Sequence, residues 1–196
     1  MKLFVSAVGV PPQHVVDRLH KAGILYMNMI GHPKHVQKCL DLGVDIICAQ
    51  GGEGGGHTGD TPTTVLIPAV VNLCKGKTSP MTGMPVQVVA AGGIYNGQTV
   101  AAALMLGASA VWVGTRFILT DEAGAPKAHQ EAVKTAGFDD NIRTIIFTVS
   151  LACSRIQTFR TDGDFRDDLF VCVQTVILRT GRMSAPRKLR SSQPRE

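Results

Sequence analysis

The sequence predicts an α/β protein: part of a (β/α)8 TIM barrel, with about five C-terminal βα units, followed by an irregular C-terminal tail. Three observations lead to this prediction. A pattern of helix, glycine and strand recurs along the chain, the strands are apolar throughout, and each strand ends at glycine. Strands that are apolar on both faces are typical of parallel sheets covered by helices. The chain has 196 residues, of which 44% are hydrophobic and 18% charged, enough for one such domain.

The predicted elements follow one another in a regular order. A strand comes first, over Leu3–Gly9. Three units then repeat one pattern, in which a helix ends at a glycine and a β-branched strand follows. These units are Val15–Gly31 with Gly23 as the stop, His35–Gly52 with Gly43, and Thr99–Arg116 with Gly107. Glycine at such a stop takes the left-handed conformation that ends many helices. Before the third unit, Cys74–Pro85 is a predicted loop and Val86–Gly93 a further strand.

Five βα units in one unbroken order are fewer than the eight of a closed barrel. A complete barrel takes about 250 residues, and this chain begins inside a strand at Lys2. We therefore expect about three N-terminal units to be absent. The partial barrel domain is expected to span residues 1–148.

Residues 149–196 differ in pattern and charge from the rest. The periodicity becomes poor, and Leu169–Leu178 is a lone apolar run, either a strand or helix or a sequence never selected to pack. Residues 1–150 hold 11 Lys and Arg against 10 Asp and Glu, a net charge of +1, whereas residues 151–196 hold 9 against 5, a net charge of +4. We expect a divergent, poorly ordered tail. Its basic charge lacks interleaved aromatics, so nucleic acid is not an expected partner.

The cysteines and the hydropathy bear on the compartment. Five cysteines are present, an odd number, and none forms a C-x-x-C pair. Residues 1–10 do not resemble a signal peptide, and no window reaches the 18 uncharged apolar residues of a membrane span. We expect reduced thiols, a cytoplasmic location and no membrane partner. Cys48, in an apolar strand, is expected to be a buried core thiol.

The segment Ala49–Asp60, AQGGEGGGHTGD, is the first candidate site. Half of its residues are glycine, which costs backbone entropy unless the chain must turn tightly or approach a ligand closely. It follows the carboxyl end of a predicted parallel strand, where ligands bind in such folds. His57 within it is a candidate general base, because histidine titrates near neutral pH. The alternative is that Glu53 and His57 only satisfy backbone groups of the loop.

Two adjacent strand ends form the second candidate site. AAGGIYNG at 90–97 and VGTRF at 113–117 place glycines before predicted helices. Backbone N–H groups there, with the helix dipole, can bind a phosphate, although Gly92 and Gly93 could also serve only a tight turn. Two lookalikes are excluded, because Val71 replaces the first glycine of a P-loop and Thr61–Pro62 interrupts a dinucleotide fingerprint. No metal site is expected, and His32 and His35 are expected to cap a helix.

These stretches, together with DEAGAPKAHQEAVKTA at 121–136, resemble the nitronate monooxygenase family, formerly 2-nitropropane dioxygenases, and are most similar to its fungal-type members. The resemblance covers about residues 2–148. It implies an FMN-dependent barrel that oxidises small nitronates and nitroalkanes with O2, with His57 as the base that removes the proton α to the nitro group. It further implies that FMN is bound by Gln50, Gly51, Gly55, Gly56, Gly92, Gly93, Gly114 and Thr115.

The sequence also departs from the family. The family's first strand and further flavin contacts have no counterpart here, and after Thr148 the family's Gly-Arg-Pro turn and closing helix are replaced by VSLACSRIQTFRTDGDF. Two alternatives therefore stay open. One is a related FMN barrel such as an enoyl reductase. The other is an inactive fragment that associates with itself through open barrel edges.

Overall fold

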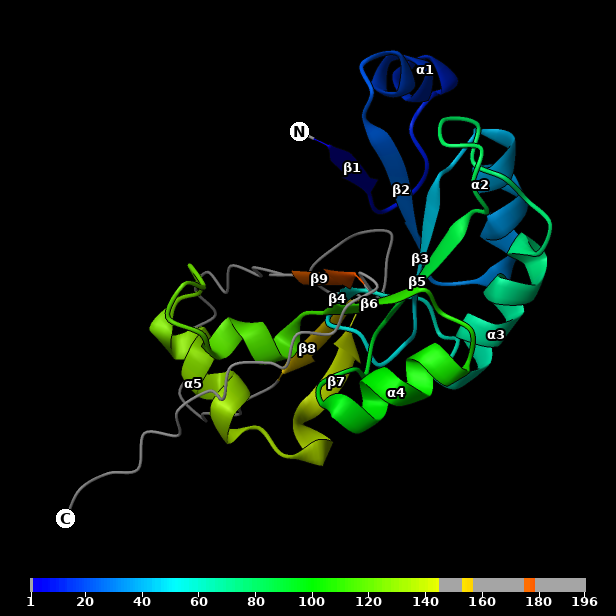
Figure 1. Cartoon of the computed structure of the whole chain (residues 1–196). Coiled ribbons are helices and arrows are strands. Elements are labelled where there is room, and N and C mark those ends of the chain that lie inside the picture. Colours follow the sequence, from blue (N-terminus) through cyan, green and yellow to red (C-terminus); the bar gives the residue numbers. More distant parts are fainter. Residues whose placement is uncertain (1, 145–152, 157–174, 179–196) are drawn as a thin grey trace.

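The computed structural model describes residues 2–144, 153–156 and 175–178, and its centre is a curled six-stranded sheet (Figure 1). The sheet has the order β1-β2-β3-β5-β6-β9. Its first five strands are parallel: β1 (Leu3–Ser6), β2 (Leu25–Ile30), β3 (Ile46–Gln50), β5 (Gln87–Ala91) and β6 (Ala110–Val113). The five predicted strands are thus confirmed, in the unbroken order that part of a barrel requires.

Helices α1 to α4 lie around the outer side of the curled sheet (Figure 1). Their bounds are α1 (Gln13–Lys21), α2 (Val36–Asp41), α3 (Thr63–Cys74) and α4 (Gly97–Met105), and α5 (Lys127–Thr135) follows β6. Three short 3-10 helices are η1 (Pro33–His35), η2 (Thr115–Leu119) and η3 (Phe138–Asp140). The predicted stops Gly23, Gly43 and Gly107 have φ of 71°, 82° and 100°. This left-handed conformation turns each helix directly into the next strand.

Both faces of the parallel sheet are apolar, as predicted. On the outer face, Tyr26 and Ile47 pack with Leu66, Ile67 and Val70 of α3. On the inner, concave face, the buried cluster consists of Met27, Cys48, Val89, Ala91 and Ala110. Cys48 is a core thiol, as predicted, and burial raises its pKa to about 12. The Cys48 thiol is therefore uncharged and unreactive.

Two described strands of the tail pair with the rest of the chain. Strand β8 (Cys153–Ile156) pairs antiparallel with β4 (Gly56–His57) and with β7 (Asn141–Thr144), in a second sheet of order β4-β8-β7. Strand β9 (Thr175–Leu178), the end of the lone apolar run, pairs antiparallel with β6. The apolar run therefore contains a strand, which is one of the alternatives that its sequence leaves open. The other residues of the tail lie outside the described part.

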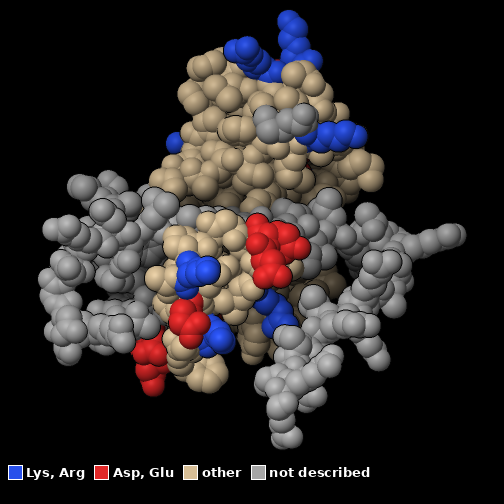
Figure 2. All heavy atoms as spheres, turned by 90° about the vertical axis from the view of Figure 1, so that its left-hand side faces the viewer, with Lys and Arg blue, Asp and Glu red and all other residues tan. Residues whose placement is uncertain are grey.

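Charged side chains are unevenly spread over the face shown in Figure 2. Lysine and arginine side chains gather at the top, the end of the molecule where α1 lies, and charges of both signs mix lower down. The last turn of α1 carries Arg18, His20 and Lys21. Because this turn leads into the start of β2, its basic residues lie beside the amino ends of the strands.

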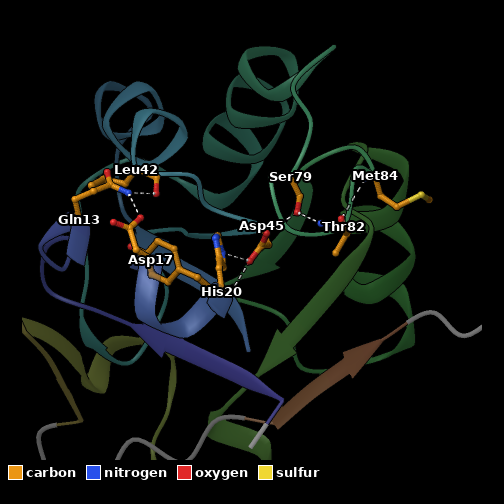
Figure 3. A network of polar contacts seen from close by, with 9 residues as sticks. Gln13, Asp17, His20, Leu42, Asp45, Ser79, Thr82 and Met84 are labelled. Atoms are coloured by element: carbon orange, nitrogen blue, oxygen red, sulfur yellow. Dashed lines mark hydrogen bonds and ion pairs between the residues drawn. The ribbon is translucent and has the colours of Figure 1, made fainter. Parts of the chain in front are cut away.

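A buried carboxylate joins the elements at this amino end of the sheet (Figure 3). Asp45 stands just before β3 and is 2% exposed. It accepts hydrogen bonds from the backbone N–H of Tyr26 at 2.7 Å, from Ser79 Oγ at 2.5 Å, and pairs with His20 Nε2 at 2.9 Å. A buried carboxylate is stable only with such partners. Asp45 therefore fastens α1, β2 and the predicted loop that holds Ser79 to one point.

Replacing Asp45 should be costly. Asp45→Ala leaves the buried Tyr26 N–H and the Ser79 hydroxyl without their acceptor, and we expect a loss of about 2–4 kcal/mol in the free energy of unfolding. Urea unfolding followed by circular dichroism measures it. Asp17→Ala, which removes an exposed carboxylate that accepts a bond from Gln13 on α1, is the matched control and should cost under about 1 kcal/mol. Equal losses in the two variants would contradict the anchoring role of Asp45.

Candidate functional site

The carboxyl ends of β3, β5 and β6 are neighbours in the sheet. Gln50 pairs with Ala91, and Ala91 with Trp112, so the segments that follow the three strands leave from one edge. The structure thereby brings the two predicted stretches together: the glycine-rich segment after β3, and the Gly92–Gly93 and Gly114–Thr115 turns after β5 and β6. The arrangement is the one in which α/β sheets bind ligands.

Backbone packs directly on backbone at this edge. A Cβ atom added to Gly92, which has φ of 91°, would lie 2.9 Å from the carbonyl oxygen of Gly51 and 3.1 Å from the nitrogen of Gly54. A second such contact joins the end of β2 to the segment, because a Cβ on Gly59 would lie 2.3 Å from the carbonyl oxygen of Gly31. These distances leave no room for any side chain. The segment is therefore glycine-rich largely because it is pressed against two strand ends.

The Gln50 side chain holds the backbone of the glycine-rich segment at Gly55. Its side chain is buried at 7% exposure, and its Nε2 donates to the carbonyl oxygen of Gly55 at 3.1 Å. Gly55 itself faces outward, since a Cβ there would meet only Thr115 Oγ1, at 4.0 Å, among the described residues. Gly56 follows with φ of 80°, a conformation that favours glycine.

His57 is exposed and lies in the short strand β4. Its backbone pairs with Cys153 of β8. Among the residues that the structure describes, no hydrogen bond of the imidazole ring is found, so the ring is not used to satisfy the loop. The two residues of the alternative interpretation thus differ: Glu53 binds the first N–H of α3, whereas no hydrogen bond of the His57 ring is found within the described residues.

Glu53 and Thr63 form a hydrogen-bonded pair that the sequence does not predict. The Glu53 carboxylate accepts hydrogen bonds from the Thr63 N–H at 2.9 and 3.2 Å and from its hydroxyl at 2.8 Å. Thr63 Oγ1 also lies 2.9 Å from the carbonyl oxygen of Gly92. A carboxylate at the first N–H of α3 satisfies a helix donor that has no partner within the helix.

Backbone donors gather in the turns after β5 and β6. Thr99 Oγ1 accepts the N–H groups of Tyr95 and Asn96, and the Asn96 side chain caps α4 in return. The capping box uses the N–H groups of Tyr95, Asn96 and Thr99, and the binding of a phosphate at this turn stays a prediction. Within the described residues, the N–H groups of Gly93 and Ile94 make no such bond, and η2 begins at Thr115 with donors that no helix carbonyl accepts.

Two buried polar atoms near this edge lack partners among the described residues, Thr58 Oγ1 and Trp112 Nε1. Thr58 follows His57, and Trp112 pairs in register with Ala91 at the end of β5. Buried polar groups without partners are uncommon in proteins, so each calls for an explanation such as a ligand. A polar ligand at this edge could supply a partner to each of these atoms.

Of the two histidines after β2, His32 caps a helix as predicted, whereas the prediction is wrong for His35, whose side chain makes no capping hydrogen bond to α2. His32 Nδ1 accepts the N–H of Lys34 and so caps η1, as predicted for a helix start. Burial, followed by the neighbouring Lys34, His32 and Lys38 cations, lowers the pKa of His35. In the described part of the chain, no group of three or more His, Cys, Asp or Glu side chains is arranged to hold a metal ion. There too, each helix is too short or too polar to cross a membrane.

Comparisons with known proteins point to one family. The profile of the Nitronate monooxygenase family matches residues 1–153. A (3aS,4S,5R,7aS)-5-hydroxy-7a-methyl-1-oxo-octahydro-1H-indene-4-carboxyl-CoA dehydrogenase of Mycobacterium tuberculosis is 42% identical over 134 residues, which are 68% of this chain and 36% of that protein. A nitronate monooxygenase of Pseudomonas aeruginosa is 38% identical over 133 residues, 64% of this chain and 36% of that protein.

Solved structures show the same fold. A nitroalkane oxidase from Streptomyces ansochromogenes is similar at a TM-score of 0.70 and 30% identity, over 80% of this chain and 45% of that one. FabK from Thermotoga maritima is similar at a TM-score of 0.69 and 27% identity, over 80% and 47%. The chain thus spans about a third of the length of these curated relatives and about half of these structures.

The contact between Gly31 and Gly59 generates a stability prediction. In Gly59→Ala the new methyl group meets the carbonyl of Gly31 at 2.3 Å, so the segment must move, and we expect a loss of about 1–3 kcal/mol in unfolding free energy. Gly97→Ala is the control, because Gly97 begins α4 and has nothing within 4 Å of its added methyl group. That variant should be neutral or slightly stabilising. Urea unfolding measures both, and a neutral Gly59→Ala would show that the two backbones are not in contact.

Proposed function

The chain belongs to the nitronate monooxygenase family, and from this premise we propose that it binds FMN at the carboxyl edge of β3, β5 and β6 and oxidises nitronates and nitroalkanes with O2. The observation that carries the proposal is the meeting of two backbone-lined turns with an exposed histidine at one sheet edge. The turns offer donors to an anion, and the histidine offers a base. Since the chain spans about a third of its curated relatives, activity of these 196 residues is part of the proposal.

We assign the flavin phosphate to the turns after β5 and β6. Gly92, Gly93, Gly114 and Thr115 lie there, and the N–H groups of Gly93 and of the start of η2 are donors of the kind that bind phosphate. We assign the flavin ring to the glycine-rich segment. Backbone at Gly51, Gly55 and Gly56 approaches a flat ring closely because no side chain intervenes, with Gln50 fixing the turn through its bond to Gly55.

The chemistry divides between cofactor and chain. When bound, FMN supplies the electron acceptor that the oxidation of a nitronate by O2 needs. The chain's own contribution is the base. The imidazole of His57 takes the proton from the carbon that bears the nitro group, and the electron pair of that C–H bond moves into the nitro group to give the nitronate anion. The turn at Gly55–Gly56 holds the imidazole outside the sheet, where a substrate can reach it.

A second candidate is oxidation or reduction of an acyl thioester at the same flavin site. The observation that favours it is the 42% identity to a protein named as a carboxyl-CoA dehydrogenase. A thioester substrate would be distinguished by turnover of an acyl-CoA or of NAD(P)H with an enoyl thioester. Turnover of a nitronate without either would favour the first candidate.

His57→Asn tests the proposed base. The variant should lose about 10²–10⁴-fold in kcat/KM with a neutral nitroalkane, since general base catalysis contributes that much. With the preformed nitronate, which needs no deprotonation, the loss should stay under about tenfold. Steady-state O2 consumption, normalised to bound flavin, measures both. His14→Asn, an exposed histidine on α1, is the control. Equal losses on the two substrates would exclude the base role.

A further inference from the structure

We propose that Glu53 and Thr63 are positioning residues that orient the Gly92–Gly93 peptide so that the N–H of Gly93 faces the flavin phosphate. The inference rests on the proposed FMN site and deepens it, because it names residues outside that site which set the site's donor geometry. Neither residue contacts the phosphate in this account. They act through the backbone of the turn after β5.

The first step is the fixing of Thr63 by Glu53. Helix α3 begins at Thr63, and the preceding Pro62 offers no side-chain cap. The Glu53 carboxylate takes this role from ten residues upstream and holds both polar groups of Thr63, its N–H and its hydroxyl. A carboxylate at a helix N-terminus is favoured by the helix dipole. Thr63 is therefore fixed in rotamer and in position.

The second step is the fixing of the peptide by Thr63. Thr63 Oγ1 lies 2.9 Å from the carbonyl oxygen of Gly92. A trans peptide is planar, so its N–H points opposite to its carbonyl. Holding the Gly92 carbonyl toward α3 therefore turns the N–H of Gly93 away from α3. That N–H is one of the donors that make no bond within the described residues.

The surrounding packing leaves the peptide little freedom to turn otherwise. The Thr63 hydroxyl is seated over Gly51, where an added Cβ would lie 2.0 Å from Thr63 Oγ1. Gly93 has φ of 69°, and a Cβ there would lie 3.3 Å from Glu53 Cβ. Glu53 thus leaves no free space for a side chain at Gly93, and the Thr63 hydroxyl lies within bonding distance of the Gly92 carbonyl. Loss of the Thr63 hydroxyl should therefore be felt at the Gly93 N–H.

The single hydroxyl proton of Thr63 gives the proposal a sharp consequence. Thr63 Oγ1 has two acceptors in reach, Glu53 Oε2 at 2.8 Å and the Gly92 carbonyl at 2.9 Å, and one proton to donate. In Glu53→Gln, the amide oxygen can still accept the Thr63 N–H, and the amide NH2 can donate to Oγ1. The hydroxyl proton is then left entirely for Gly92. Glu53→Gln should therefore keep the peptide oriented, whereas loss of the hydroxyl should release it.

Affinities for FMN and for riboflavin, which lacks the phosphate, test the proposal. Thr63→Val keeps the shape of the side chain and removes the hydroxyl. We expect it to weaken FMN binding about tenfold, about 1.4 kcal/mol, and to change riboflavin binding less than twofold. Thr63→Ser and Glu53→Gln should bind FMN within about twofold of the parent. Thr64→Val is the control, because Thr64 is the exposed neighbour on the same helix. Equal weakening for the two flavins would overturn the proposal.

A second readout needs no flavin. In the labelled protein, Thr63→Val should move the carbonyl ¹³C resonance of Gly92 and the amide resonance of Gly93, and Thr63→Ser should move them much less. If the parent chain binds no FMN but these shifts appear, the FMN proposal fails and the orienting role of Thr63 stands. If both resonances keep their parental positions in Thr63→Val, the orienting role fails whatever the flavin affinity is.

Discussion

Close packing of backbone on backbone at the carboxyl edge of the sheet is the constraint on which the rest of the site depends. The segment after β3 touches the end of β5 through Gly51, Gly54 and Gly92, and the end of β2 through Gly31 and Gly59. A Cβ atom added to Gly92 would lie 2.9 Å from the carbonyl oxygen of Gly51, and one added to Gly59 would lie 2.3 Å from that of Gly31. Neither contact leaves room for a side chain. Because these segments interlock without side chains, backbone itself forms this edge, and it is exposed there at Gly55 and Gly93. A surface of fixed peptide dipoles is suited to a flat cofactor with an anionic end.

The two ends of the sheet are stabilised by different physical means. At the amino end, the buried carboxylate of Asp45 gathers hydrogen bonds from a helix, a strand and a loop. At the carboxyl end, the Glu53 carboxylate caps α3, and the Thr63 hydroxyl reaches the turn after β5. The first carboxylate holds the layers together. The second belongs to the glycine-rich segment and is connected through Thr63 to the proposed phosphate turn, so it contributes both to stability and to the proposed site. In TIM barrels generally, the active site lies at the carboxyl end of the strands and the opposite end contributes to stability.

The sequence predicts those parts of the molecule that follow from local patterns. Apolar strands and glycine stops such as Gly23 and Gly43 identify the βα units, because periodicity and left-handed glycines are local properties. The position of His57 after β3 follows from the same order. The pairing of Glu53 with Thr63 could not be predicted, since a side-chain bond across a loop leaves no period in the sequence. The pairing of β4 with β8 was hidden for the same reason, because Cys153 is distant from His57 in the chain.

Retention of FMN by the chain is the measurement that tests the central claim most directly. The purified protein is mixed with excess FMN and desalted, and its visible absorption spectrum is recorded with the protein concentration. The account predicts close to one flavin per chain, with absorption bands shifted in shape from those of the free cofactor. A colourless protein whose circular dichroism still shows folded α/β structure would contradict the account, because the edge would then be built but would not hold the cofactor.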